Sequence, residues 1–281
     1  MPGQVCDVQE SDVEYLRHGD AGLLARLYQP AGPGPFPAVV NVHGGAWTSG
    51  DRLNNEPTSR ELAALGCVVM AVDFRMPPQA GYPDSVADIN YAVRWLKGHA
   101  GDYLVDPDRV GGIGFSSGGH QLALNALRPD DPRYAVPGGP PPVRAQDASL
   151  AFLITCYGVL DPVRRYAMAR TRHLEHLVAS HHAYWPDEAA MAEGSPQRIV
   201  DDREPVRLPP ALIIQGEVDN NLTPDMADRF CAAYRAAGGL ADVRRYPDAP
   251  HGFLRREPDS VAAQAARAAI AEFIGRWTGR P

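Results

Sequence analysis

A serine framed by two glycines is the most informative short pattern in this 281-residue chain. The pentapeptide Gly114-Phe115-Ser116-Ser117-Gly118 stands between an apolar run and a stretch with helical spacing. Glycines two positions before and after a serine allow a sharp strand-to-helix turn that leaves the hydroxyl exposed at the start of the helix. The pattern predicts that Ser116 is a nucleophile. The alternative is a phosphate-binding turn, but the lysine and the spacing of a phosphate loop are absent.

A serine hydroxyl needs a general base, and that base needs a carboxylate to hold it in the right tautomer. The sequence supplies both after the serine. Asp219 follows the apolar run 211–215, and His251 stands in a loop before the last helical segment. We therefore expect Asp219 to be the acid and His251 the general base, with Glu217 and Asp225 as rivals of Asp219.

Acyl transfer also needs N–H donors that point at the developing oxyanion. The stretch His43-Gly44-Gly45-Ala46-Trp47 directly follows the apolar run 38–42, where an oxyanion loop is expected. We expect the backbone amides of this loop, together with the amide of Ser117, to form the oxyanion hole. His43 is expected to hold the loop in shape and not to transfer protons.

The segments that must position these residues alternate between strand-like and helical patterns. Short apolar runs predict buried strands at 38–42, 67–72, 110–115, 151–156 and 211–215. Helical spacing is found at 57–65, 85–97 and 117–127, and a hairpin is expected over 12–28. The alternation predicts an α/β fold, with a mainly parallel central sheet flanked by helices.

Two stretches interrupt this alternation. Residues 128–146 are rich in Pro, Gly and Asp and are expected to be irregular, whereas residues 162–210 have helical composition with many aromatic and histidine residues. We expect a single domain over residues 1–281 with a helical cap inserted at 162–210. Aromatic residues in and near the cap predict a pocket for a small aromatic or cyclic substrate, with simple packing of the cap as the alternative. The residues proposed for this pocket are Trp47, Tyr157, Tyr184 and Trp185.

Composition restricts the partners. The formal net charge is −7, from 27 basic and 34 acidic residues. The basic residues form scattered pairs, such as Arg164-Arg165, Arg244-Arg245 and Arg255-Arg256, which we expect to be solvated surface. A basic stripe is missing, so we expect no nucleic-acid partner. No apolar run approaches the ~20 residues that span a bilayer, and the first residues do not resemble a signal peptide, so we expect a cytoplasmic protein without a membrane partner.

The remaining chemistry-bearing residues do not cluster. The cysteines at positions 6, 67, 156 and 231 lie far apart, without the paired spacing of zinc or redox sites. There is no grouped His, Cys and carboxylate set and no dinucleotide fingerprint. We expect reduced structural thiols, no metal and no cofactor. The sequence leaves a homodimer open.

Taken in order, these motifs resemble the α/β-hydrolase superfamily, and within it the hormone-sensitive-lipase-like and feruloyl-esterase-like carboxylesterases. The resemblance implies an α/β-hydrolase fold and oxyanion amides from Gly45, Ala46 and Ser117. Ala46 departs from the family's usual third glycine. The matching pieces are His43 to Trp47, Val72 to Pro78, Tyr82-Pro83 with Asp88, Asp106 to Val110, Gly114 to His120, Asp219, and His251 to Phe253.

The function that follows is hydrolysis of a small soluble ester through an acyl-enzyme. An amidase or arylformamidase of the same fold would use the same three residues but would have to protonate a poorer leaving group. A noncatalytic ligand receptor is a third alternative, because fold alone does not fix function. The complete serine, histidine and aspartate set argues against a receptor, and rates on matched ester and amide substrates separate the first two.

Overall fold

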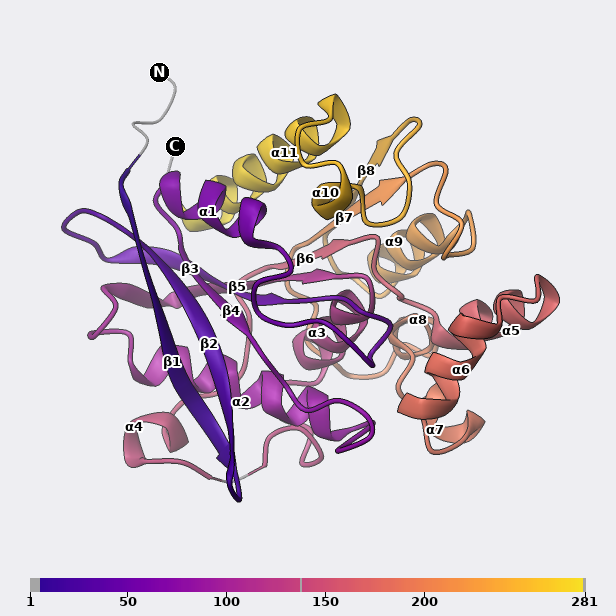
Figure 1. Cartoon of the computed structure of the whole chain (residues 1–281), viewed down its shortest axis with the longest axis horizontal. Coiled ribbons are helices and arrows are strands. Elements are labelled where there is room, and N and C mark those ends of the chain that lie inside the picture. The colour runs from indigo at the N-terminus through magenta and orange to yellow at the C-terminus, as the bar shows by residue number, and fades with distance from the viewer. Residues whose placement is uncertain (1–5, 137, 280–281) are drawn as a thin grey trace.

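The computed structural model describes residues 6–136 and 138–279. Within these residues, eight strands form one sheet in the order β1-β2-β4-β3-β5-β6-β7-β8 (Figure 1). The six strands from β4 to β8 in this order are parallel, and β2 is antiparallel to both β1 and β4. The predicted α/β class is therefore confirmed. The strands are β1 (Val8–His18), β2 (Ala21–Pro30), β3 (Phe36–Val42), β4 (Val68–Val72), β5 (Val105–Phe115), β6 (Leu153–Cys156), β7 (Ala211–Gly216) and β8 (Ala241–Tyr246).

The central strands are buried on both faces. Every residue of β3, β4, β6 and β7 is buried. A strand covered on both faces has no solvent side, so its sequence is a continuous apolar run and does not alternate. The edge strand β1 instead carries several exposed residues. This difference in burial explains why continuous apolar runs in the sequence indicate the central strands.

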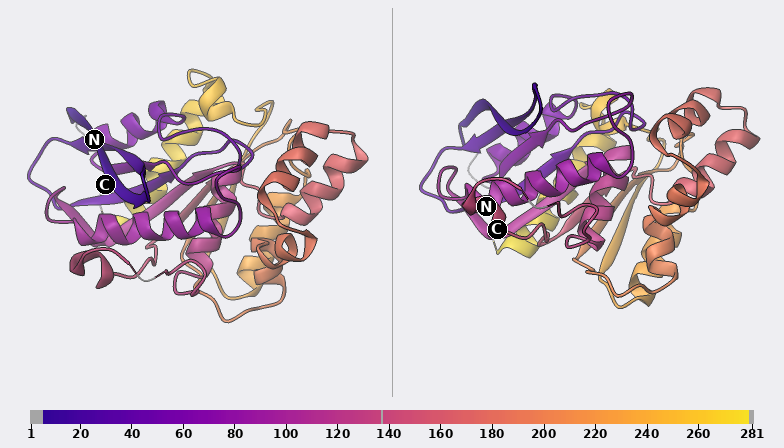
Figure 2. Two further views of the ribbon diagram at one scale, coloured as in Figure 1. Left: turned by 60° about the horizontal axis from the view of Figure 1, so that its bottom comes forward. Right: turned by 90° about the horizontal axis from the view of Figure 1, so that it is seen from below.

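Helices cover both faces of the sheet (Figures 1 and 2). The crossover through α1 leads from β3 back to β4, whereas the crossovers through α2 and α3 lead in the opposite direction along the sheet. Since such crossovers are right-handed, α1 lies on one face, with α11, and α2 and α3 lie on the other. The helices of these layers are α1 (Glu56–Ala64), α2 (Asp84–Gly98), α3 (Ser117–Leu127), α9 (Met226–Ala236), α10 (Phe253–Arg256) and α11 (Val261–Thr278).

A group of helices stands between β6 and β7, in the segment expected to be a helical insertion. Figure 1 shows α5, α6 and α7 together at one end of the sheet. Three of the helices begin with a side-chain cap, because Asp161, Asp187 and Ser195 accept hydrogen bonds from the backbone amides of Arg164, Ala190 and Arg198, respectively. The helices are α5 (Pro162–Thr171), α6 (Glu175–Tyr184), α7 (Glu188–Glu193) and α8 (Pro196–Asp201).

The described part of the segment expected to be irregular contains one short helix, α4 (Pro141–Arg144). Its first two residues are prolines, which are tolerated in the first turn of a helix because their missing N–H groups would have no partner there. The Pro and Gly content of 128–146 concealed this turn.

Candidate active site

Ser116 occupies a strained turn between β5 and α3. Its backbone dihedrals are φ 52° and ψ −119°, a region that costs a non-glycine residue about 1–3 kcal/mol. Backbone hydrogen bonds hold the turn: the Ser116 amide donates to the Cys156 carbonyl at 2.9 Å, and the Val159 amide donates to the Ser116 carbonyl at 3.1 Å. The turn therefore has the strained geometry of a nucleophile elbow.

The two framing glycines are required by close approach of backbone atoms. A Cβ on Gly114 would lie 2.6 Å from the Gly118 carbonyl oxygen, and one on Gly118 would lie 2.2 Å from the His43 carbonyl oxygen. Backbone atoms cannot move aside as a flexible side chain can, so neither position accepts a larger residue without distortion. This close packing of backbone atoms is the physical reason for the two glycines that frame Ser116 in the sequence.

The structure brings Ser116, His251 and Asp219 together, although they are far apart in the sequence. The Ser116 Oγ lies 2.8 Å from the His251 Nε2, and the His251 Nδ1 lies 2.8 Å from the Asp219 Oδ2. A carboxylate can only accept, so the Nδ1 carries the proton and the Nε2 is free to accept the serine proton. This is the geometry that a serine nucleophile and its base require.

Asp219 is fixed by four donors. His251 and the Gln215 amide group, at 3.1 Å, donate to its Oδ2, while the backbone amides of Asn221 and Leu222 donate to its Oδ1 at 2.8 and 3.2 Å. Burial acts to raise the pKa of Asp219, but the hydrogen bonds outweigh it and the pKa is lowered. The carboxylate is therefore ionised at neutral pH.

The rival acids point elsewhere. Glu217 is exposed, and Asp225 forms an ion pair with Arg164, with its Oδ2 2.8 Å from the Arg164 Nη1. Only Asp219 of these three acids contacts His251 in the part of the chain that the structure describes.

The loop after β3 lies against the serine turn. A Cβ on Gly44 would be 3.0 Å from the Ser116 Cβ, which shows how closely the two segments approach. Among the described residues, no acceptor takes a hydrogen bond from the backbone amides of Gly45, Ala46 or Ser117. Unpaired amides beside a nucleophile are the donors that an oxyanion hole needs.

His43 is buried beneath this loop. Its ring stacks on Phe74, with 4.3 Å between the ring centres, and its Nδ1 donates to the Gly44 carbonyl at 2.8 Å. Burial lowers the pKa of His43, so the ring is neutral. These contacts fit a residue that shapes the loop.

A cavity of about 350 Å³ opens at Ser116. It lies at the carboxyl ends of the parallel strands, because its walls include the residues that follow β3, β5, β7 and β8, together with parts of α5 and α6. Tyr157, one of the residues proposed for the pocket, lines it and packs edge-on against His251 at 5.0 Å between ring centres.

The other residues proposed for the pocket form a packed aromatic cluster. Trp47 stacks on Tyr184, with 5.2 Å between ring centres, and meets Trp185 edge-on at 6.1 Å. All three side chains are buried, and none of them is among the described residues that line the cavity. The structure therefore supports the alternative interpretation of the sequence, in which these side chains pack the inserted helices against the domain.

His120 joins this cluster to the serine helix. The Trp47 indole N–H donates to its Nδ1 at 3.1 Å, so the proton of the ring is on the Nε2, which donates to the Gly194 carbonyl at 2.8 Å. Burial lowers the pKa of His120 to about 4. His120 therefore remains neutral and packs behind the serine turn.

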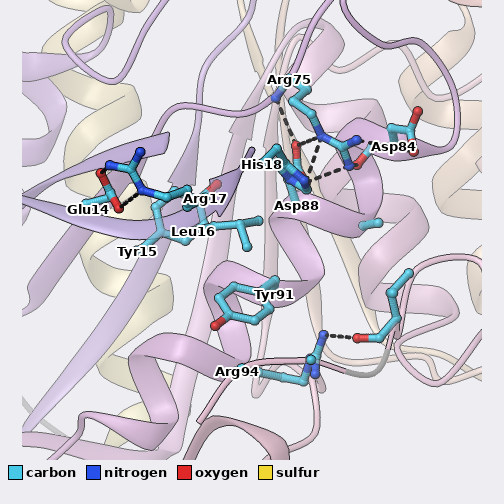
Figure 3. Close-up of a pocket in the computed structure, with 14 residues that line it drawn as sticks. Glu14, Tyr15, Leu16, Arg17, His18, Arg75, Asp84, Asp88, Tyr91 and Arg94 are labelled. Carbon is cyan, nitrogen blue, oxygen red and sulfur yellow. Dashed lines mark hydrogen bonds and ion pairs between the residues drawn. The ribbon is translucent and has the colours of Figure 1, made fainter. Parts of the chain in front are cut away.

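A larger cavity of about 640 Å³ lies against β1 and α2 (Figure 3). Most of its charged residues form ion pairs. Asp88 lies between His18 and Arg75 (Figure 3), with its Oδ1 2.8 Å from the His18 Nε2 and 2.9 Å from the Arg75 Nη2. Arg94 instead donates to the Asn90 side chain and the Val136 carbonyl. Its described lining contains no serine, threonine or cysteine and shares no residue with the cavity at Ser116. The larger cavity therefore lacks a side chain of the kind predicted to act as the nucleophile.

Sequence reasoning missed Arg165. The pair Arg164-Arg165 was expected on the solvated surface, but the structure buries Arg165 to 1% exposure and places it in the wall of the cavity at Ser116. Successive residues of a helix point about 100° apart, so adjacent arginines on α5 cannot share one face. The helical spacing of 162–171 was the signal that could have separated them.

Among the described residues, no three or more His, Cys, Asp and Glu side chains are placed to hold a metal ion. None of the described helices is long and apolar enough to cross a membrane.

The sheet order and the serine turn after β5 define an α/β-hydrolase. A family model named BD-FAE matches residues 26–233, and the chain belongs to this family. Among solved structures, esterase 2 of Thermogutta terrifontis with bound propionate is 27% identical, with a TM-score of 0.75 and coverage of 98% of this chain and 94% of that one. The resemblance drawn from the motifs is thereby confirmed.

Curated relatives include two proteins of Mycobacterium tuberculosis. Esterase LipQ is 28% identical over 97% of this chain and 63% of its own length, and probable carboxylic ester hydrolase LipM is 33% identical over 55% of this chain and 36% of its own length. This chain thus spans between about a third and two thirds of the length of the first curated relatives it matches.

Proposed function

We propose that this protein is a carboxylesterase that cleaves small esters through an acyl-enzyme, with Ser116 as nucleophile, His251 as general base and Asp219 as the orienting acid. The observation that carries the proposal is the pair of 2.8 Å contacts that link the three side chains. The esterases named above, in sequence and in structure, support the same chemistry.

In the first step, the Ser116 Oγ attacks the ester carbonyl while His251 takes the serine proton. The negative charge that develops on the carbonyl oxygen is stabilised by the amides of Gly45, Ala46 and Ser117. His251 then donates its proton to the departing alcohol, which leaves an acyl group on Ser116. In the second step, His251 activates water to release the acid, and Asp219 stabilises the imidazolium in both steps.

The cavity supports a small substrate. At about 350 Å³ it is near the lower end of the range for small-molecule sites. Structures of the Thermogutta terrifontis enzyme have propionate and butyrate bound. We therefore propose short acyl groups for this chain, within a single α/β-hydrolase domain in which the segment 162–210 acts as a cap over the cavity.

The test is the release of p-nitrophenol from p-nitrophenyl acetate and butyrate by the wild type and by Ser116→Ala. We expect a burst followed by steady turnover in the wild type, and no activity above background in the folded variant. Ser117→Ala is the matched control, because it keeps the backbone amide and should keep turnover. Loss of activity in Ser117→Ala but not in Ser116→Ala would overturn the assignment of the nucleophile.

Covalent labelling gives an independent test. The Thermogutta terrifontis enzyme is phosphorylated by paraoxon in a solved structure. Treatment of this protein with paraoxon should add one diethylphosphoryl group to Ser116, measured by intact mass and peptide mapping. Labelling at another residue, or equal labelling of Ser116→Ala, would contradict the mechanism.

A further inference from the structure

The cavity at Ser116 has an unbalanced charge. Among its described lining residues, Arg165, Arg255 and Arg256 are cationic, and none is an aspartate or glutamate. Asp219 stands behind His251, where its two oxygens are already occupied by the donors described above. The side of the cavity that meets a substrate is therefore positive, although the whole protein carries a net charge of −7.

Arg165 is the buried member of this set. Its Nε donates to the Asn221 carbonyl at 3.2 Å, and its Nη1 donates to the His181 Nε2 at 3.2 Å. Its Nη2 has no acceptor among the described residues. Burial lowers the pKa of Arg165 to about 10, although the charge of Asp219 acts in the opposite direction, so the guanidinium remains charged at neutral pH. Burying a charge without a partner costs free energy, so buried charged side chains in proteins are usually paired.

The partners of Arg165 do not neutralise it. A guanidinium has no acceptor atom, so His181 must accept through its Nε2 and carry its proton on the Nδ1. Burial, and then the nearby charge of Arg165, lower the pKa of His181 to about 2, which keeps the ring neutral. The face of Trp47, 5.3 Å from the guanidinium carbon, adds a cation–π contact but no negative charge.

Arg255 and Arg256 lie at the cavity on α10, directly after His251. Both are exposed, and neither forms an ion pair with an acid in the described part of the chain. Nearby arginines behave differently: Arg164 pairs with Asp225, and Arg229 pairs with Asp161. Two free cations at an opening raise the local concentration of anionic ligands.

We propose that the cavity selects esters whose acyl or alcohol part carries a carboxylate, which the Arg165 Nη2 binds inside the cavity while Arg255 and Arg256 attract it. This inference rests on the proposed ester hydrolysis at Ser116. A guanidinium suits this role because its planar N–H groups match the geometry of a carboxylate and its charge is fixed.

A purely structural role of Arg165 gives a different pattern. Because its Nε holds the Asn221 carbonyl, loss of Arg165 could displace the loop that carries Asp219. That displacement would lower turnover of all esters equally. A binding role lowers turnover of the anionic ester more than that of its neutral counterpart.

The experiment compares kcat/KM for two matched pairs of esters. The first pair, p-nitrophenyl hydrogen adipate and p-nitrophenyl hexanoate, places the charge on the acyl part. The second pair, 4-acetoxybenzoate and 4-acetoxybenzamide, places it on the alcohol part. The wild type should prefer the anionic member of one pair, and the responding pair identifies the part of the substrate that meets Arg165.

Arg165→Gln should reduce that preference by roughly ten- to a hundredfold, the usual worth of a hydrogen bond to a charged group. Arg165→Lys should restore part of it. Arg170→Gln removes an exposed charge from the same helix, away from the cavity, and should leave the preference unchanged. An equal fall for both members of each pair in Arg165→Gln would overturn the proposal and leave Arg165 as a positioning residue.

If Arg165→Gln does not fold, the exposed double variant Arg255→Gln/Arg256→Gln and the salt dependence provide the test. The preference should fall in the double variant, and also in the wild type as the salt approaches 1 M, where the screening length is roughly 3 Å. A preference that neither change moves refutes the proposal.

The outcome also separates this inference from the proposed function. Turnover of the neutral esters without an anionic preference would retain the esterase and reject the carboxylate site. If no ester is cleaved, the esterase fails, and calorimetric binding of adipate and 4-hydroxybenzoate to wild type and Arg165→Gln still tests the site. Equal binding by the two proteins would then reject it.

Discussion

Replacement of Asp219 by asparagine tests the linkage between the acid and the base most sharply. All four neighbours of the carboxylate are donors: His251 and Gln215 at Oδ2, and the amides of Asn221 and Leu222 at Oδ1. An asparagine has one acceptor oxygen and one NH₂ group, so no orientation satisfies all four. With its oxygen at the two backbone amides, its NH₂ group faces the His251 Nδ1 and selects the tautomer with a proton on the Nε2.

That tautomer cannot accept the proton of Ser116. The same change in a serine protease triad lowers kcat roughly 10⁴-fold, which corresponds to about 5.4 kcal/mol in the barrier. We expect a loss of this order in Asp219→Asn, measured with p-nitrophenyl butyrate. The unpaired donors should also lower the free energy of unfolding by about 1–3 kcal/mol, measured by urea denaturation.

Asp225→Asn is the matched control, because Asp225 lies near the same loop but pairs with Arg164 at the surface. It should change kcat less than about twofold, since exposed ion pairs contribute little. Retention of more than about a tenth of the wild-type kcat by Asp219→Asn, or a comparable loss in Asp225→Asn, would refute the reasoning.

Two further predictions concern stability. Gly118→Ala places a Cβ 2.2 Å from the His43 carbonyl oxygen. It should lower the free energy of unfolding in urea by about 1–3 kcal/mol or more and abolish esterase turnover. Gly101→Ala, with no atom within 4 Å of the added Cβ, should be nearly neutral, and equal stability of the two variants would contradict the packing argument. The pKa of His120 is about 4 in the folded protein and about 6.5 in the unfolded chain, so between pH 4 and 6.5 unfolding takes up a proton at this residue. The contribution of His120 to the free energy of unfolding is therefore complete above pH 6.5 and is lost as the pH falls towards 4. The free energy of unfolding of the wild type should therefore fall by about 3 kcal/mol more than that of His120→Gln across this window, and parallel pH profiles of the two proteins would exclude the effect.

The sequence by itself determined much of the fold, because the signals involved are local. Buried parallel strands are continuous apolar runs, and the framing glycines of Ser116 reflect a turn that only a small residue allows. The order of serine, aspartate and histidine along the chain followed from motifs beside predicted strand ends. The boundaries of helix α3 agree with the segment predicted for it, 117–127.

Only the tertiary structure decided which residues face the cavity. Side-chain type placed Trp47, Tyr184 and Trp185 in a substrate pocket, but the inserted helices bury them against one another. The same composition placed Arg165 in solvent, whereas the rotation of α5 turns it inward beside Asn221 and His181. Helical spacing in the sequence indicates that adjacent arginines point in different directions, but it does not say which of them faces the cavity. That depends on how helices far apart in the sequence pack together.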